Sequence, residues 1–369
     1  MIHREISDKR FQMDSLDGLR GFAALIVVFS HVSNTGIHFL PIMDLRGTGK
    51  SGVFLFFLLS SFLLTLPLLK MGKEIFTLSN ISHYWQRRFF RIYPLYSLYL
   101  LLGLITTWLF ANYLGKANAG IPLILDWSSF IQHLSLQEGK GVTWSIAVEF
   151  KFYFFLPIIA LITVYLLSFS FSLTVLFFLV IIIASQVAYP QSDSLTNDPR
   201  LMPYLPIFFI GMLLAVIQNK INSHEIVTRK FNYLFKISGI IGVSGLLLMT
   251  PLVYSFFFDE VKNVYFHKQF ILYSILWSLV ILSAVNTTGF IQTLFTSPIL
   301  AFYGALSFSV YLFHPVFIEL IGSFNINSYL SAWLILFTTT VSSYISFKLI
   351  EGPISKFKIR RSSLPSMFR

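Results

Sequence analysis

Cysteine is absent from the 369-residue chain, and charged residues make up only 12% of it. The lack of cysteine excludes disulfide bonds, cysteine-ligated metals and thiol catalysis. A soluble domain of this size carries about twice that charged fraction. A Walker phosphate loop, zinc-ligand spacing, a heptad seam, internal repeats and low-complexity tracts are also missing from the sequence. We therefore expect no metal ion and no tightly bound cofactor.

Long apolar segments dominate what is present, because hydrophobic residues make up 55% of the chain. We predict an all-α, polytopic membrane protein with about ten transmembrane helices, each apolar and long enough to cross. Segment 121–137 is too short and polar for a clear span. It is predicted to be an interfacial or re-entrant helix, which leaves eleven spans open. The predicted spans are 21–40, 52–69, 92–111, 143–166, 171–189, 203–219, 237–258, 269–287, 299–321 and 328–350.

The net charge of +11 suggests nucleic acid in a soluble chain, but a membrane chain places such charge in cytoplasmic loops. Most Lys and Arg residues fall in the loops on the side of the N-terminus, which predicts that both termini are cytoplasmic. The first twenty residues lack a signal-peptide layout. We expect one membrane domain over 1–369, with cytoplasmic tails at 1–20 and 351–369 and no appended soluble domain.

Arg20 and His31 lie eleven residues apart on one apolar segment. Eleven helical steps bring both side chains to one face, about 16 Å apart along the axis. Ionisable residues at membrane depth are costly and usually functional, and imidazole suits proton transfer near neutral pH. The alternative is a histidine that only packs against a neighbouring helix.

Trp144, Ser145 and Glu149 open the fourth predicted span from its outer side. Ser145 and Glu149 are four residues apart and share a helix face. Glu149 lies about two turns inside, and its depth is predicted to match that of His31. A Glu149–His31 pair would orient the imidazole and raise its basicity. The alternative is a carboxylate that only joins two helices.

Arg88 and Arg91 stand three residues apart at the cytoplasmic start of the third predicted span, so they can face one anion together. Paired guanidinium groups suit phosphates, although basic residues also anchor ordinary cytoplasmic helix ends. Tyr311 and His314 share a face in the ninth span, as a substrate pocket or as a polar stripe between packed helices. Ser60 lies in a small-residue stretch that suits close helix contact.

These motifs together resemble acyltransferase family 3, the integral-membrane acyltransferases that modify bacterial surface glycans. The likeness covers nearly the whole chain. The family's Arg-x10-His, Arg-x-x-Arg and Trp-Ser-x-x-x-Glu patterns correspond to the arginines, histidine, tryptophan, serine and glutamate introduced above. The resembling segments are LDGLRGFAALIVVFSH, LFFLLSSFLLT, RRFFRIYPLY, TWSIAVEFKFYFFLP, SFSVYLFHP and the closing Glu351-Gly-Pro353. Two departures are visible: Phe54 stands where many members have Asp, and Ser61 stands where many have Gly.

The resemblance implies a stand-alone enzyme of the bacterial cytoplasmic membrane. It would move an acyl group, with acetyl expected, from cytoplasmic acyl-coenzyme A to a hydroxyl of a surface or lipid-linked carbohydrate. The catalytic residues would be His31, as base or nucleophile, and Glu149. The coenzyme's phosphates would bind Arg20, Arg88 and Arg91. The residues on the acceptor side would be Trp144, Ser145, Tyr311, His314 and Ser60.

Two other functions stay open at this point. A transporter of lipid-linked sugars is compatible with many spans and intramembrane charges, but the sequence shows no repeat symmetry and no paired broken helices. A sensor or scaffold without turnover is disfavoured because no soluble output domain is apparent.

Overall fold

Helices make up the computed structural model, and no strand occurs among the residues that it describes. Those residues are 2–41, 44–71, 77–116, 118–167, 170–190, 197–222, 231–258, 269–324 and 326–355. The helices in chain order are α1 (Ile2–Asn34), α2 (Gly49–Met71), α3 (Leu78–Tyr113), α4 (Trp127–Leu134), α5 (Thr143–Leu161), α6 (Phe171–Ala188), α7 (Leu205–Asn222), α9 (Asn232–Leu248), α10 (Pro251–Phe257), α11 (Phe270–Asn286), α12 (Phe290–Phe295), α13 (Pro298–Ala305), α14 (Ser307–Gly322), α15 (Ser328–Ser346) and α16 (Gly352–Ser355). The final tail beyond residue 355 lies outside the described residues, so its predicted place is not tested.

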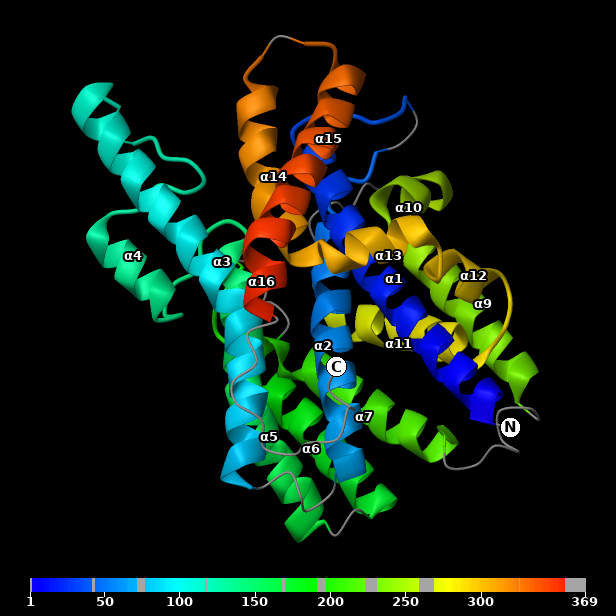
Figure 1. Ribbon diagram of the computed structural model, residues 1–369. Coiled ribbons are helices and arrows are strands. Elements are labelled where there is room, and N and C mark those ends of the chain that lie inside the picture. The colour runs from blue at the N-terminus through cyan, green and yellow to red at the C-terminus, as the bar shows by residue number, and fades with distance from the viewer. Residues whose placement is uncertain are drawn as a thin grey trace.

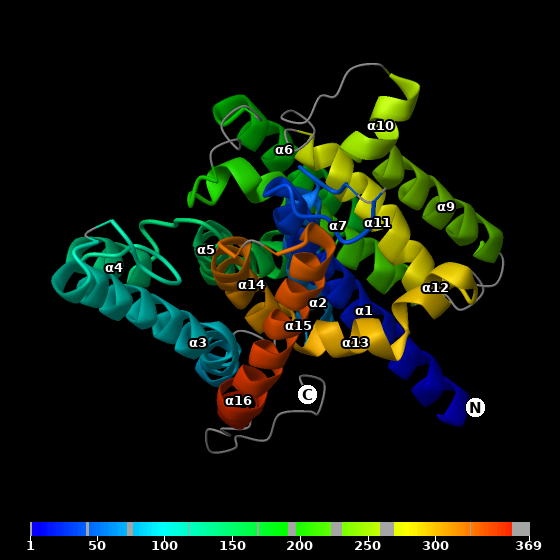
Figure 2. The same ribbon diagram turned by 90° about the horizontal axis from the view of Figure 1, so that it is seen from above.

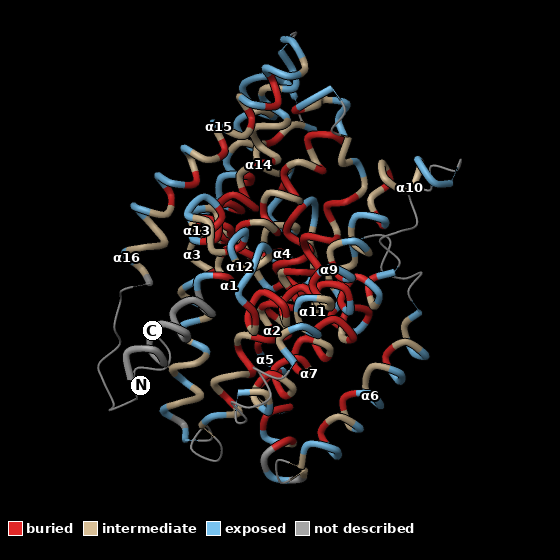
Figure 3. Tube along the Cα trace, turned by 90° about the vertical axis from the view of Figure 1, so that its right-hand side faces the viewer, coloured by how far each residue is buried: buried red, intermediate tan, exposed pale blue. Residues whose placement is uncertain are grey.

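Helix α2 occupies the centre of the bundle and packs against α1, α5, α7 and α11. The buried residues concentrate on these helices in the middle of the molecule (Figure 3). Two thirds of the most apolar window of α2 is buried, whereas the corresponding share of α6 is 17%. Viewed from above, α3 and α4 project on one side of this centre, and α9 and α10 lie on the other (Figure 2). An apolar helix with an exposed surface suits contact with lipid.

Seven helices are long and apolar enough to cross a membrane by themselves, and two bent pairs raise this number to nine. The predicted total of ten is therefore not confirmed, although each predicted segment coincides with one of these helices or pairs or with α11. Helix α11 accounts for the difference because its 17 residues are at the lower limit for a crossing. Segment 121–137 contains only the eight-residue helix α4, so it does not span, as expected.

Two predicted spans are bent rather than straight, which corrects the expectation that broken helices are missing. Helices α9 and α10 meet at 84°, and α13 and α14 meet at 79°. Helix α10 begins at Pro251, which has no amide hydrogen for the preceding turn, and the Thr250 hydroxyl caps its start. The bend between α13 and α14 falls at Leu306, so that α14 begins with Ser307 inside the bundle.

Glycines allow α1 to cross α13 with the two backbones in contact (Figure 1). A Cβ atom on Gly21 would lie 2.0 Å from the carbonyl oxygen of Leu300, and one on Gly304 would lie 2.1 Å from that of Asp17. Neither neighbour is a flexible side chain that can move aside. The crossing fixes the part of α1 that carries Arg20.

We expect the substitution Gly21→Ala to push α13 away from α1. Overpacking in a close-packed interior costs about 1–3 kcal/mol or more, which exceeds the gain in helix propensity of about 1 kcal/mol. The melting temperature of the purified protein in detergent should fall by several degrees. Gly322→Ala is the matched control, because its Cβ would meet nothing closer than Ile37 at 3.7 Å. Equal melting temperatures for both variants would contradict the proposed tight crossing.

The departure at Ser61 is accommodated by the neighbouring helix. Ser61 is fully buried on α2, and a Cβ atom on Gly211 of α7 would lie 2.0 Å from its hydroxyl oxygen. The Ser61 hydroxyl donates to backbone carbonyls of its own helix, at Phe57 and Leu58. The close contact expected of glycine on α2 is thus provided by glycine on α7.

Candidate active site

Side chains from five helices, α1, α2, α3, α5 and α14, line a cavity near the centre of the bundle, which we call the arginine cavity. Most of the predicted site residues meet here, although they are far apart in sequence. Arg88 and Arg91 line it together, as their three-residue spacing predicts, and so do Ser145 and Glu149. The polar residues that line the cavity are Arg20, Ser60, Arg88, Arg91, Ser145, Glu149, Tyr153, Ser307 and Tyr311.

The arginine cavity has an excess of positive charge. Arg20, Arg88 and Arg91 lie close enough for their charges to interact. Arg20 bonds Asp17 at 3.1 Å, and the ring of Tyr153 lies 6.0 Å from the guanidinium of Arg88. The Nε atom of Arg88 is buried and has no hydrogen-bond partner among the described residues. A buried charged donor without a partner is costly, so this atom indicates a place for an anionic ligand.

The start of α14 strengthens that indication. Ser307 and Phe308 line the arginine cavity, and no side chain caps the helix that they begin. The first amide groups of a helix carry partial positive charge and readily accept phosphate oxygens. The bend at Leu306 therefore directs a helix N-terminus towards the three guanidinium groups.

Glu149 is held by two hydroxyl groups, and this corrects the predicted Glu149–His31 pair. Ser60 donates to Oε1 of Glu149, and the Tyr153 hydroxyl donates to the same oxygen at 2.6 Å. A Cβ atom on Gly49 would lie 3.4 Å from the His31 ring, so His31 is level with the start of α2. Ser60 lies eleven residues further along α2, which is about 16 Å. The depths of Glu149 and His31 therefore do not coincide.

His31 instead pairs with His314, since α14 packs against the last turns of α1. The His31 Nδ1 and His314 Nε2 atoms are 2.8 Å apart. His314 is fully buried, whereas His31 lines a second, more open cavity, which we call the histidine cavity. Its described lining includes polar groups at the ends of α1 and α14, among them Asn34, Thr35 and Glu319.

Tyr311 lies between the two cavities. It lines the arginine cavity, and its ring centre is 6.0 Å from that of His314 one turn further along α14. Its hydroxyl lies 2.7 Å from the Ser145 hydroxyl and donates to the carbonyl oxygen of Val142 at 3.1 Å. Tyr311 and Ser145, expected on the acceptor side, thus line the arginine cavity rather than the histidine cavity.

Trp144 does not line either cavity. It is 3% exposed and packs against Tyr204 and Phe57, at ring-centre distances of 5.1 and 6.0 Å. Trp144 thus packs at the start of α5, because the helix begins inside the bundle and its first turn is already covered. Its expected contact with the acceptor stays a prediction.

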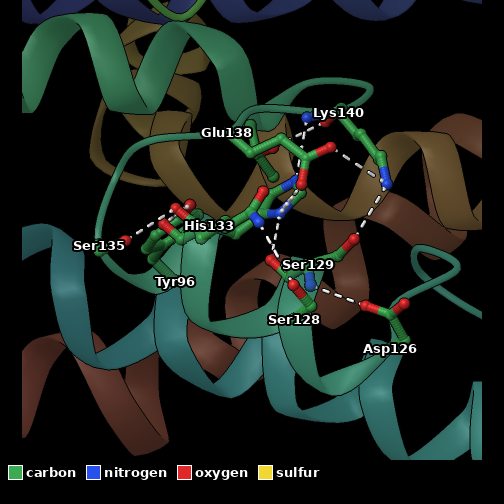
Figure 4. Close-up of polar contacts among 10 residues, drawn as sticks. Tyr96, Asp126, Ser128, Ser129, His133, Ser135, Glu138 and Lys140 are labelled. Atoms are coloured by element: carbon green, nitrogen blue, oxygen red, sulfur yellow. Dashed lines mark hydrogen bonds and ion pairs between the residues drawn. The ribbon is translucent and has the colours of Figure 1, made fainter.

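A hydrogen-bonded histidine holds the loop before α5 in place (Figure 4). His133, fully buried at the end of α4, lies with Nδ1 2.7 Å from the Ser129 carbonyl oxygen. Its Nε2 accepts from the Lys140 backbone N–H at 3.1 Å, and the Tyr96 hydroxyl donates to its carbonyl at 2.9 Å. Both ring nitrogens are occupied, so His133 has a structural role.

The same loop fixes where Ser145 enters the arginine cavity. A Cβ atom on Gly139 would lie 2.5 Å from Cα of Trp144, so the loop and the first turn of α5 are in direct contact. Glu138 and Lys140 form an ion pair at 3.2 Å that closes the loop. We therefore expect the hydrogen bond from Lys140 to His133 to help hold this loop against α5.

We expect this loop to weaken at acidic pH. Burial lowers the pKa of His133, and this desolvation outweighs the Ser129 hydrogen bond and the Glu138 charge, both of which raise it. The unfolded chain therefore takes up the proton first. The stability present above the ordinary histidine pKa of about 6.5 is lost as the pH falls below it towards the lower folded value.

The measurement is the melting temperature in detergent at about pH 8 and about pH 5.5, for the wild type and for His133→Gln. Between the two pH values, the melting temperature of the wild type should fall more than that of the variant, because glutamine does not titrate. Comparing the two proteins removes the contribution of the other histidines. An equal fall in melting temperature for both proteins would contradict the prediction, because protonation of His133 would then not weaken the loop.

Several contacts escaped the sequence prediction. Tyr153, the second partner of Glu149, lies one turn after it, and that spacing is the signal that was overlooked. Glu351 accepts a hydrogen bond from Ser309, which joins the closing motif to α14. The pairing of His31 with His314 has no local signal, because the two residues are 283 positions apart.

Comparison with known proteins shows which family the chain belongs to. A family described as an acyltransferase domain matches residues 13–348. A Staphylococcus aureus (strain MRSA252) protein named "Putative O-acetyltransferase" is 25% identical over 97% of this chain and 60% of its own length. The peptidoglycan O-acetyltransferase OatA of Listeria monocytogenes is 24% identical over 94% of this chain and 56% of its own. The O-acetyltransferase OatA of Staphylococcus aureus (strain NCTC 8325) is 22% identical over 93% and 57%.

The chain thus spans somewhat more than half the length of these relatives. No solved structure matches it. The matched residues, 13–348, include all the residues that line the two cavities. The chain therefore belongs to acyltransferase family 3, the acyltransferase-domain family.

Proposed function

We propose that this protein transfers an acetyl group from acetyl-coenzyme A to a hydroxyl group of a carbohydrate. The observation that carries the proposal is the arginine cavity, where the buried Nε of Arg88 has no partner. Arg20 and Arg91 add two further guanidinium groups to the same cavity. Guanidinium groups bind phosphates through forked hydrogen bonds, and coenzyme A carries several phosphates.

The donor enters from the cytoplasm in this proposal. The end of the bundle where α2 ends and α3 begins carries Lys70, Arg87, Arg88 and Arg91. At the opposite end, described cations such as Arg46 and Arg200 are fewer, and each is paired with a carboxylate two positions away. An excess of Lys and Arg marks the cytoplasmic side of a membrane protein. On this assignment both termini are cytoplasmic, and the membrane is that of a bacterial cell.

The acyl group reaches His31 along the wall of the arginine cavity that is nearest to the start of α2. Val53 and Tyr311 line that wall, and Val53 lies one turn of α2 beyond Gly49, which is level with His31. One turn is about 6 Å, so the thioester end of an extended donor has only a short gap to cross. The ring centres of Phe56 and Tyr311 are 6.2 Å apart, and both side chains line the arginine cavity.

The acceptor sugar occupies the histidine cavity, which is open and lined by hydroxyl, amide and carboxylate groups that suit sugar hydroxyls. His31 takes the proton from the acceptor hydroxyl. The hydroxyl oxygen then attacks the thioester carbonyl, a new C–O bond forms, and the C–S bond breaks. The proton passes from His31 to the departing sulfur, which leaves as free coenzyme A. Glu149 keeps its place beside Arg88 and offsets part of the positive charge there.

The test is binding of acetyl-coenzyme A to the purified protein by calorimetry, followed by release of free thiol with a mixture of carbohydrate acceptors. Binding and acceptor-dependent thiol release would support the proposal. The two bent helix pairs favour a second candidate, a transporter of a lipid-linked sugar, because broken helices often form transport sites. A transporter should neither bind nor consume the donor, so this outcome would replace our proposal.

A further inference from the structure

We propose that His314 is the positioning residue that fixes the tautomer of His31 and leaves Nε2 of His31 as the reacting nitrogen. The inference rests on the proposed function, and it concerns which group orients the base. It is carried by two contacts of one fully buried ring. His314 Nδ1 is 3.1 Å from the carbonyl oxygen of Val310, and His314 Nε2 is 2.8 Å from Nδ1 of His31.

The protons follow from these partners. A carbonyl oxygen only accepts hydrogen bonds, so Nδ1 of His314 carries a hydrogen. A neutral imidazole has one N–H group, so Nε2 of His314 is an acceptor. Its partner must then donate, which places the hydrogen of His31 on Nδ1. The Nε2 atom of His31 consequently keeps its lone pair.

The free nitrogen belongs to the ring that lines the histidine cavity. Among the described residues no hydrogen-bond partner is recorded for His31 Nε2, while His31 itself is only partly buried there. His314 is fully buried and does not line that cavity. The two rings therefore have different roles: His31 meets the ligand, and His314 holds His31 in position.

This arrangement replaces the carboxylate that usually orients a catalytic histidine. In a Ser-His-Asp triad the carboxylate accepts from Nδ1–H and fixes the tautomer. Here Glu149, bonded to Ser60 and Tyr153, lies about 16 Å along α2 from the level of His31. A neutral imidazole suits a buried position better, because an unpaired carboxylate there is costly.

Two substitutions separate the acceptor from the rest of the ring. Glutamine places a polar atom near the position of histidine Nε2, so His314→Gln keeps an acceptor for His31. Asparagine places its polar atoms near the position of Nδ1, so His314→Asn keeps the contact to Val310 and loses the one to His31. The pair is matched in polarity, and both variants are checked for folding by their melting temperature.

We expect His314→Gln to keep kcat within about tenfold of the wild type. His314→Asn should lower kcat by about 10²- to 10⁴-fold, the contribution of a positioned general base, since a wrong tautomer alone can cost about 10⁴-fold. The KM for acetyl-coenzyme A should stay unchanged in both, since the arginine cavity is intact. The proposal would be overturned if His314→Asn were as active as the wild type, or if His314→Asn and His314→Gln were equally inactive.

A second readout does not depend on turnover. Nitrogen-15 labelling of histidine side chains distinguishes protonated from unprotonated ring nitrogens by NMR, and the His31 signals are those that disappear in His31→Gln. We expect Nδ1 of His31 to be protonated in the wild type and in His314→Gln, and mixed in His314→Asn. An Nε2-protonated His31 in the wild type would overturn the assignment. The expected tautomer in a protein without transferase activity would refute the proposed function alone.

Discussion

Replacing His31 with alanine should lower kcat for acetyl transfer by about 10²- to 10⁴-fold, while the protein remains folded and still binds acetyl-coenzyme A. General base catalysis contributes this range. Besides His31, the described lining of the histidine cavity contains one other group that could act as a base, the exposed Glu319. The donor should still bind, since its phosphates meet the arginine cavity about 16 Å away along α1. The measurements are the rate of thiol release and the calorimetric affinity.

His38→Ala is the control for this prediction. His38 also lies at the end of the bundle that holds His31, but its recorded contact is a backbone hydrogen bond to Ser328, and it lines neither cavity. Its substitution should leave transfer unchanged. Full activity in a folded His31→Ala variant would remove His31 from the mechanism.

Replacing Arg88 with glutamine should raise the KM for acetyl-coenzyme A by about 10- to 100-fold. A hydrogen bond to a charged group contributes about 1.5–3 kcal/mol, and Arg88 is the arginine whose Nε is buried without a partner. Its effect on kcat should be small by comparison, because the guanidinium holds the far end of the donor. A steady-state titration with acetyl-coenzyme A separates the two parameters.

Two further variants sharpen the result. Arg87→Gln removes the neighbouring cation, which lines an adjoining apolar pocket and not the arginine cavity, so it should leave KM nearly unchanged. Arg88→Lys keeps the charge and loses the fork, so it should recover only part of the affinity. If Arg87→Gln and Arg88→Gln weakened binding equally, general surface charge rather than the cavity would bind the donor.

Local patterns in the sequence predicted the groups that line the arginine cavity. The three-residue spacing of Arg88 and Arg91 and the four-residue spacing of Ser145 and Glu149 each place two side chains on one helix face. Both pairs line the cavity. Such predictions succeed because they need only the geometry of one helix, and the apolar lengths of the spans located the helices themselves.

Contacts between helices could not be predicted in the same way. The partner of His31 depends on α14 packing beside α1, and α14 takes that position only because the chain bends by 79° at Leu306. No proline lies at that bend, although Gly304 and Ser307 flank it. The expected Glu149–His31 pair was wrong because depth was counted from span boundaries, whereas α2 shows that the two levels differ.

The predicted total of ten spans is not confirmed, for a related reason. Helix α11 has only 17 residues, yet most of its residues are buried or partly buried against α2, α7 and α9. The hydropathy of an apolar segment is the same whether lipid or other helices surround it. Hydropathy therefore finds apolar helices correctly, but it does not distinguish a complete crossing from a buried, shorter helix.

The most direct test of the account uses the protein reconstituted in vesicles with a carbohydrate acceptor enclosed inside and acetyl-coenzyme A, labelled on the acetyl group, added outside. The account predicts that label appears on the enclosed carbohydrate, that free coenzyme A stays outside, and that both signals depend on His31 and Arg88. Label that never reaches the enclosed carbohydrate, with a folded wild-type protein and several acceptor classes, would contradict transfer between the two cavities.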